Sequence, residues 1–409
     1  MKLFLPNLTF EDDLSGRHTK FTAQTQRAVS ELAPLMGLMA GEADVVAAHE
    51  VPLTEHLPKV LQHVNFRRVA DVAELVAQPD ATLVPWGWTD SLRKLAMANG
   101  AALATSAVPS AKAVWNINSR RFNADFDRVL TKSSVHLPFG PDQFGCLCTD
   151  VSSWSAAVRQ LEQSGFDRWV AKTQISHAGR QRLIGTGTEL NSQQRGWLKK
   201  HLVQPGGVYV EPWVTPEAEC GLQFDVTGTI ERPDVHLVGV TCLRNDAAGR
   251  YRGSVIATDD RLEASWQEVI EHGRAICMAA RKLGYAGPLG IDAFRFTLPN
   301  GVPATRLSND INGRFTMGRL ALHLRRCLQH NEYGLWAHFI SPQTAEPSTE
   351  ASAEHRESST KTTPESVRIE ETSPAMIAGR SVRQRTALLI GPNLKDLSEA
   401  ARQLDAENA

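Results

Sequence analysis

Short apolar runs alternate with amphipathic segments over the first hundred residues of the chain. Three apolar runs have the length of buried strands, at 2–7, 43–50 and 81–88. Apolar residues recur at helical spacing over 22–39, 67–77 and 89–99. Strands that alternate with helices in this way are typical of a parallel α/β layer. We therefore expect residues 1–109 to form a parallel α/β domain.

The pattern changes over 110–341, where strands come in pairs and helices flank the pairs. A strand, a polar turn and a second strand occupy 168–185, and a longer pair of strand patterns spans 287–315. An amphipathic helix is expected at 262–283, and another begins near Met317. Two clusters of this kind predict two small α+β lobes that face a cleft.

The end of the chain divides into a polar stretch and an apolar tail. Residues 342–380 are dominated by Ser, Thr, Glu and Pro and carry few large apolar side chains. Such a segment cannot bury enough surface to offset its ordering entropy, so we expect a disordered linker there. The tail at 381–409 has the pattern of a strand and a helix. We expect it to pack on a folded domain, because a unit of this size is not stable alone.

A polar alternation stands out in the segment "LSNDINGRFTMG" at 307–318. Asp310, Asn312 and Arg314 occupy every second position, with Ile311 and Phe315 among the intervening residues. Successive side chains of a strand point to opposite faces, so the three polar residues would line one face. A row of acid, amide and guanidinium suits a site for a metal and a phosphate. The solvated face of an antiparallel sheet would give the same pattern.

A lysine within a strand pattern, Lys172, precedes a polar turn that contains Gly179. A lysine that points into a cleft beside such a turn can hold phosphates while backbone N–H groups cover them. A surface lysine on a hairpin is the simpler interpretation of this segment taken alone.

Glu211 ends another apolar strand and is followed by Pro212, which has no N–H to donate. The free backbone groups of Trp213 and Val214 could then pair with the edge of a base, and Glu219 could accept from ribose hydroxyls. An edge strand that ends at a proline, with Trp213 in a core, is the alternative.

One acid, Asp292, lies within an otherwise apolar strand pattern. A lone buried carboxylate is costly unless it is hydrogen-bonded, paired or bound to a metal. Mg²⁺ prefers oxygen ligands and typically takes one or two carboxylates plus substrate phosphates. Asp292 and Asp310 on neighbouring strands, with Asn312 two residues further on, would supply such a set.

Composition narrows the classes of partner. Lys and Arg number 44 against 45 Asp and Glu, so no overall charge favours nucleic acid or an anionic membrane. No apolar run has the length that spans a bilayer. Six cysteines in 409 residues lack the density of a disulfide scaffold, and we expect a cytoplasmic protein. Serine-hydrolase "GxSxG" and metalloprotease "HExxH" motifs are absent from the sequence.

The order of these stretches resembles the ATP-grasp superfamily over roughly residues 110–335. The most specific likeness is "GIDAFRF" followed by "NDINGRFTMG", which is similar to the family's "D…E-x-N-x-R" ending, with Asp310 where the family usually has Glu. The segments "VAKTQISHAGR" and "VEPWV" match its phosphate-loop and hinge segments. The resemblance implies a preATP-grasp-like α/β layer at 1–109 and a two-lobed ATP-grasp fold at 110–341.

The resemblance also implies roles for individual residues. ATP would be bound by Arg120, Lys172, Gly179, Glu211, Trp213, Val214 and Glu219. Mg²⁺ would be held by Asp292, Asp310 and Asn312. Arg314, together with Lys172, would act on the transferred phosphoryl group.

The activity that this likeness implies is an ATP- and Mg²⁺-dependent ligase. A small-molecule carboxylate would attack ATP to give an acyl phosphate, and an amine or another nucleophile would displace the phosphate. Positioning and charge neutralisation would do most of this work, which agrees with the lack of an obvious nucleophile. Two alternatives stay open: an ATP-grasp-type kinase, and a nucleotide-binding module without turnover. The sequence carries no signal for the oligomeric state.

Overall fold

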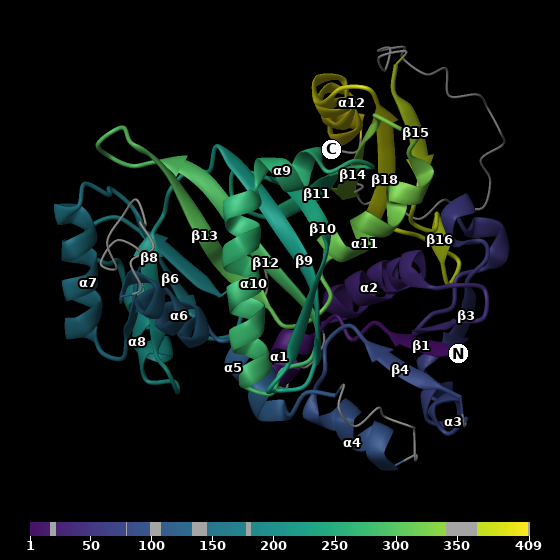
Figure 1. Cartoon of the computed structure of the whole chain (residues 1–409), viewed down its shortest axis with the longest axis horizontal. Coiled ribbons are helices and arrows are strands. Elements are labelled where there is room, and N and C mark those ends of the chain that lie inside the picture. Colours follow the sequence, from purple (N-terminus) through teal and green to yellow (C-terminus); the bar gives the residue numbers. More distant parts are fainter. Residues whose placement is uncertain are drawn as a thin grey trace.

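The structure is a computed structural model that describes residues 1–16, 22–78, 80–98, 108–132, 145–176, 181–340 and 366–407. Figure 1 shows a small N-terminal layer, a large central sheet and a small sheet at the far side. Within the described ranges, no helix combines the length and the apolarity that crossing a bilayer requires.

The N-terminal layer is a parallel sheet of four strands in the order β3-β2-β1-β4. Its strands are β1 (Lys2–Leu5), β2 (Val45–Ala48), β3 (Asn65–Arg68) and β4 (Thr82–Pro85). Its helices are α1 (Phe10–Leu14), α2 (Ala23–Leu32), α3 (Val72–Val76) and α4 (Asp90–Ala98). The strand β3 lies partly where the sequence predicts a helix from 67, because pairing with β2 outweighs the local periodicity.

The small sheet is antiparallel, in the order β5-β8-β6-β7. Its strands are β5 (Cys146–Cys148), β6 (Trp169–Thr173), β7 (Arg182–Gly185) and β8 (Val208–Pro212), and its helices are α7 (Val151–Gln163) and α8 (Ser192–Leu202). Trp154 of α7 and Trp169 of β6 meet edge to face at 5.4 Å in the core of this lobe. Two short helices, α5 (Ala111–Asn118) and α6 (Arg120–Lys132), precede it along the chain.

The large sheet has the order β13-β12-β9-β10-β11-β14-β18-β15, with every neighbouring pair antiparallel. Its strands are β9 (Ala218–Gly228), β10 (Pro233–Asn245), β11 (Tyr251–Ala257), β12 (Gly287–Thr297), β13 (Pro303–Asn312), β14 (Tyr333–Ile340), β15 (Arg368–Glu371) and β18 (Gln384–Gly391). Its helices are α9 (Arg261–Ser265), α10 (Gln267–Lys282), α11 (Met317–His323) and α12 (Leu394–Glu407). One apolar core joins this sheet to the N-terminal layer, for example through Trp86, Phe315 and Trp336.

The C-terminal segment departs from its expectation in one part and agrees in another. Residues 366–380, predicted as the end of a disordered linker, contain β15 and the strand β16 (Met376–Ile377), which pairs with β17 (Arg380–Ser381). Pairing of β15 with β18 supplies the backbone hydrogen bonds that composition could not reveal. The predicted strand and helix of the tail are β18 and α12, and they pack on the large sheet beside β14 (Figure 1).

Docking of this tail predicts unequal effects for two leucine truncations. Leu389 of β18 is fully buried against Leu335 and Leu397, whereas Leu394 at the start of α12 is 39% exposed. Leu389→Ala should lower the free energy of unfolding by about 2–5 kcal/mol. Leu394→Ala, the matched control, should lower it by less than about 1 kcal/mol. Urea denaturation followed by tryptophan fluorescence measures both, and equal losses would contradict the packing described.

Candidate functional site

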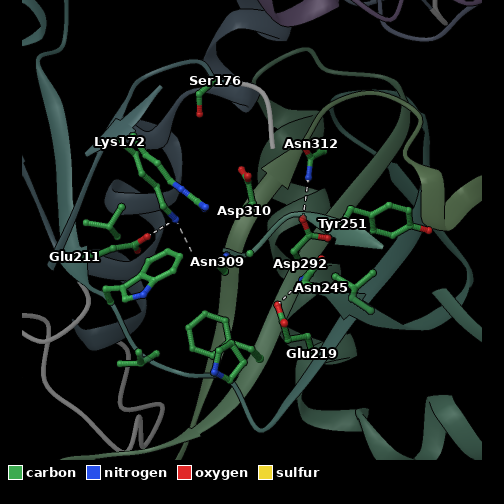
Figure 2. Close-up of a pocket in the computed structure, with 18 of the residues that line it drawn as sticks. Lys172, Ser176, Glu211, Glu219, Asn245, Tyr251, Asp292, Asn309, Asp310 and Asn312 are labelled. Carbon is green, nitrogen blue, oxygen red and sulfur yellow. Dashed lines mark hydrogen bonds and ion pairs between the residues drawn. The ribbon is translucent and has the colours of Figure 1, made fainter. Parts of the chain in front are cut away.

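A pocket of about 490 Å³ lies between the small sheet and the large sheet. It brings together every site residue predicted from the sequence that the structure describes: Arg120, Lys172, Glu211, Trp213, Val214, Glu219, Asp292, Asp310, Asn312 and Arg314. Gly179 lies outside the described residues. Figure 2 shows Lys172 and Glu211 on one side of this space, with Asp292, Asp310 and Asn312 on the other.

Two carboxylates face the pocket because β12 and β13 run antiparallel in a register that sets Asp292 opposite Asp310. Asn312 lies two residues further along β13, and its Nδ2 donates to Asp292 Oδ2 at 3.4 Å. Burial, reinforced by the neighbouring charge of Asp310, raises the pKa of Asp292 to about 7. The pair would therefore gain from a bound cation.

Arg120 is the cation that Asp310 meets in this structure. At the start of α6, its guanidinium donates to both Asp310 oxygens, at 2.7 and 2.9 Å. The Arg120 side chain is 8% exposed. Burial acts to lower the pKa of Arg120, but Asp310 and Glu211 outweigh it and the net shift is upward. This bidentate geometry is the strong form of an arginine–carboxylate pair.

Lys172 on β6 forms an ion pair with Glu211 on the adjacent β8. The Lys172 Nζ also approaches Asn309 Oδ1 across the pocket, at 3.5 Å (Figure 2). Burial lowers the pKa of Lys172, while the charge of Glu211 opposes this shift. The lysine thus links the small sheet to the large one.

The backbone groups of Trp213 and Val214 follow directly after β8. The N–H of Trp213 donates to the carbonyl of Arg168 at 2.9 Å, so it is not available to a base. Of the backbone groups expected to be free at Trp213 and Val214, the N–H of Trp213 is therefore already hydrogen-bonded. The carbonyl of Trp213 and the N–H of Val214 have no backbone partner in the described part of the chain.

Glu219 on β9 lies at the same end of the pocket. Its Oε2 accepts a hydrogen bond from Asn245 Nδ2 at 2.8 Å. Burial raises the pKa of Glu219, and the bond from Asn245 acts in the opposite direction. The carboxylate is therefore held in place by a neutral donor and keeps acceptor capacity toward the pocket.

Arg314 reaches the pocket from the turn after β13 and is held by the N-terminal layer. Its Nε donates to Glu11 Oε1 at 2.6 Å, and a terminal nitrogen donates to the carbonyl of Phe315 at 2.8 Å. Trp86, in the "PWGW" segment, lies under the guanidinium at 5.8 Å. Glu11 is 5% exposed, so the pair is largely desolvated.

The side chains of the pocket supply only some of the ligands that a divalent cation needs. Asp292, Asp310 and Asn312 offer the oxygen atoms that Mg²⁺ prefers. Within the described ranges, no three His, Cys, Asp or Glu side chains gather to hold a metal ion. The remaining ligands would therefore have to come from water or from the phosphates of a bound nucleotide.

Several pocket residues were missed by the sequence analysis. Asn309 contacts Lys172, Asn245 holds Glu219, and Arg182 of β7 stacks on the Trp213 ring at 4.9 Å. Gln223 and Thr316 also line the pocket. A strict period of two along β13 would turn Asn309 away from the face that carries Asp310 and Asn312. A bulge shifts the register between Asp292 and Phe294 and breaks this period, so the sequence pattern did not predict Asn309 in the pocket.

Comparison with solved structures identifies the fold. N5-carboxyaminoimidazole ribonucleotide synthetase from Thermus thermophilus aligns over 99% of this chain and 97% of its own, with 13% identity and a TM-score of 0.54. N5-carboxyaminoimidazole synthetase from Staphylococcus aureus aligns over 99% and 97%, with 8% identity and a TM-score of 0.53. Biotin carboxylase from Campylobacter jejuni, in a complex with β-γ-ATP, aligns over 92% and 88%, with 11% identity and a TM-score of 0.53.

These likenesses establish that the chain has the ATP-grasp fold, preceded by the parallel α/β layer that the sequence predicts. The fold that the sequence resemblance implied is thus confirmed. No protein-family model matches the sequence, and no curated protein matches it either.

The raised pKa of Asp292 predicts a pH-dependent stability. A carboxyl group whose folded pKa is raised stabilises the folded state fully below its unfolded pKa of about 4 and loses that contribution as pH rises through about 7. Asp292→Asn is neutral throughout, so its melting temperature should exceed that of the wild type clearly more at about pH 8 than at about pH 5, where only the first part of the loss has occurred. Thermal denaturation at the two pH values measures this difference.

Asp234→Asn, at an exposed position on β10, is the control for that comparison. It should follow the wild type at both pH values. If Asp292→Asn also followed the wild type, Asp292 would not be a buried carboxyl group with a raised pKa.

Proposed function

We propose that the protein is an ATP-dependent ligase that joins a small-molecule carboxylate to an amine or another nucleophile through an acyl phosphate. The observation that carries the proposal is the convergence, in one pocket, of two facing carboxylates with Lys172 of β6 and with arginine side chains from α6 and from the turn after β13. The activities printed for the similar structures belong to those proteins, and the fold alone does not carry an activity to this chain.

The nucleotide would lie along the pocket from the segment after β8 to the carboxylate pair. The Val214 N–H and the Trp213 carbonyl offer a donor and an acceptor to the edge of a base. Glu219 would accept from the ribose hydroxyls. Lys172 and Arg120 carry the positive charge for the phosphates.

Asp292, Asp310 and Asn312 would hold Mg²⁺ together with phosphate oxygens. When bound, the ion neutralises charge on the phosphates and helps to orient them. Phosphates would compete with Asp310 for Arg120 and with Glu211 for Lys172. Nucleotide binding would thereby free Asp310 for the ion.

In the first step an oxygen of the substrate carboxylate attacks the γ-phosphorus, and the bond from that phosphorus to the bridging oxygen breaks to release ADP. In the second step the amine attacks the acyl carbon, phosphate leaves, and the amine nitrogen loses a proton. Arg314 faces the same space, and its charge would stabilise the transferred group. The chain itself orients the reactants and supplies the fixed charges.

Both substrates would be small molecules, and we place the reaction in the cytoplasm. One observation favours a second candidate, a nucleotide-binding module without turnover. Arg120 occupies both oxygens of Asp310, and a pair that persisted with nucleotide bound would remove a carboxylate from the metal. A kinase that uses a hydroxyl acceptor would share the same residues.

ADP release separates these functions. Purified protein with Mg-ATP and a fractionated metabolite extract should release ADP only when fractions that supply both a carboxylate and an amine are combined. Asp310→Asn should lower the rate by about a hundredfold, because it removes a charged ligand of the metal. A coupled assay for ADP measures both results.

Asp234→Asn serves again as the control and should keep the wild-type rate. ADP release with a single hydroxyl compound would instead identify a kinase. If no combination gave ADP although Mg-ATP raised the melting temperature, the protein would be a nucleotide-binding module.

A further inference from the structure

A buried glutamine faces the pocket on the far side of the carboxylate pair from the ribose end. The registers of β9, β12 and β13 define three successive rows across the pocket floor. The rows are Glu219–Phe294, Gly221–Asp292–Asp310 and Gln223–Gly290–Asn312. Successive rows are two residues apart, which is about 7 Å along a strand. Gln223 therefore lies one row beyond the carboxylates, on the side away from Glu219.

The hydrogen bonds of Thr316 orient the amide of Gln223. The Thr316 Oγ1 accepts from the N–H of Arg319 at 3.3 Å, as the N-cap of α11. Its single hydrogen is donated to Gln223 Oε1 at 2.8 Å. The amide oxygen is thereby turned toward Thr316, and the NH₂ group is left to face elsewhere.

That NH₂ group makes no hydrogen bond with any residue that the structure describes, although Gln223 is 3% exposed and lines the pocket. The Nε2 atom is reached from the pocket and is not sealed in the core, so it is available to a ligand that supplies an acceptor.

The space beside the NH₂ group is kept open by Gly318. A Cβ at this position would lie 2.9 Å from Gln223 Nε2 and 3.1 Å from Thr241 Oγ1. Any side chain larger than hydrogen would therefore crowd the amide. The backbone is otherwise ordinary here, so close approach explains the glycine better than an unusual conformation does.

We propose that Gln223 and Arg314, which both line the pocket, form the subsite for the carboxylate that receives the phosphoryl group. The groups that face this end are donors: the Gln223 NH₂ group and a guanidinium that Glu11 already orients. They suit a carboxylate or bicarbonate oxygen, and they do not suit an ammonium group. The subsite rests on the proposed function, because the row spacing places its occupant next to a γ-phosphate bound at Asp292 and Asp310.

Gln223→Met removes the donor at similar volume and should raise the KM for the carboxylate by about tenfold or more. Its KM for ATP should stay within about twofold of the wild type, because Gln223 lies one row from Asp292 and Asp310 and two rows from Glu219. Glu219 lies one row from Asp292 and Asp310 on the opposite side. Glu219→Gln should therefore raise the KM for ATP and leave the KM for the carboxylate near the wild-type value. Steady-state ADP release with the active carboxylate fraction measures both constants.

Gly318→Ala is the second variant, and it keeps the experiment decisive if Gln223→Met does not fold. Alanine is favourable within a helix, but its methyl group would enter the space beside Nε2. It should raise the same KM. An unchanged KM for the carboxylate in either folded variant would overturn the subsite.

Equilibrium binding separates this inference from the proposed function. Wild-type protein saturated with Mg-ADP is titrated with sodium bicarbonate, sodium acetate and sodium succinate, with sodium chloride as the control, and tryptophan fluorescence is followed. A saturable change that Gln223→Met abolishes supports the subsite even if no ADP is ever released, and the responding anion distinguishes bicarbonate from an organic acid. If none of the three carboxylates binds the wild type, the subsite is refuted, whatever the nucleotide does.

Discussion

Desolvation of charge is the constraint on which the pocket depends. Arg120–Asp310, Lys172–Glu211 and Arg314–Glu11 are three ion pairs whose cations are at most 13% exposed. Removing two charges from water costs free energy that their mutual attraction returns only in part. Buried ion pairs of this kind are therefore a weak source of stability. The pairs instead fix the positions of their side chains, because a buried charge must stay beside its partner.

The three pairs also explain why distant parts of the chain meet at one site. Glu11 comes from the N-terminal layer, Lys172 and Glu211 come from the small sheet, and Arg314 follows the last strand of the central pair. An anionic ligand that takes a cation from its carboxylate partner keeps that cation paired, and the carboxylate then needs a new counter-charge, which Mg²⁺ would supply to Asp310. The same arrangement that fixes these side chains therefore makes the pocket responsive to phosphate and carboxylate groups.

Local patterns predicted much of this site. The alternation of Asp310 and Asn312, the lone acid Asp292 and the strand lysine Lys172 all lie where a period of two places them. The layer order of the fold also followed from periodicity and from the family likeness. These features depend on residues near one another in sequence, which is the range over which patterns carry information.

The features that escaped prediction depend on contacts between distant segments. Arg168 takes the N–H of Trp213, Glu11 meets Arg314 from 303 residues away, and a bulge in β13 turns Asn309 toward Lys172. The strand β15, within a stretch of linker-like composition, forms because β18 offers it a paired edge. Local periodicity carries no information on hydrogen bonds between segments that are distant in sequence. These details therefore become visible only in the folded chain.

The central claim is that this pocket binds a nucleotide together with Mg²⁺ between the two sheets. Calorimetric titration of ATP into the protein, with Mg²⁺ and then with a chelator, tests it most directly. The account predicts one saturable site that needs the metal for full affinity and that Lys172→Met weakens severely. Absence of nucleotide binding in the wild-type protein, or binding that is indifferent to both the metal and Lys172, would contradict it.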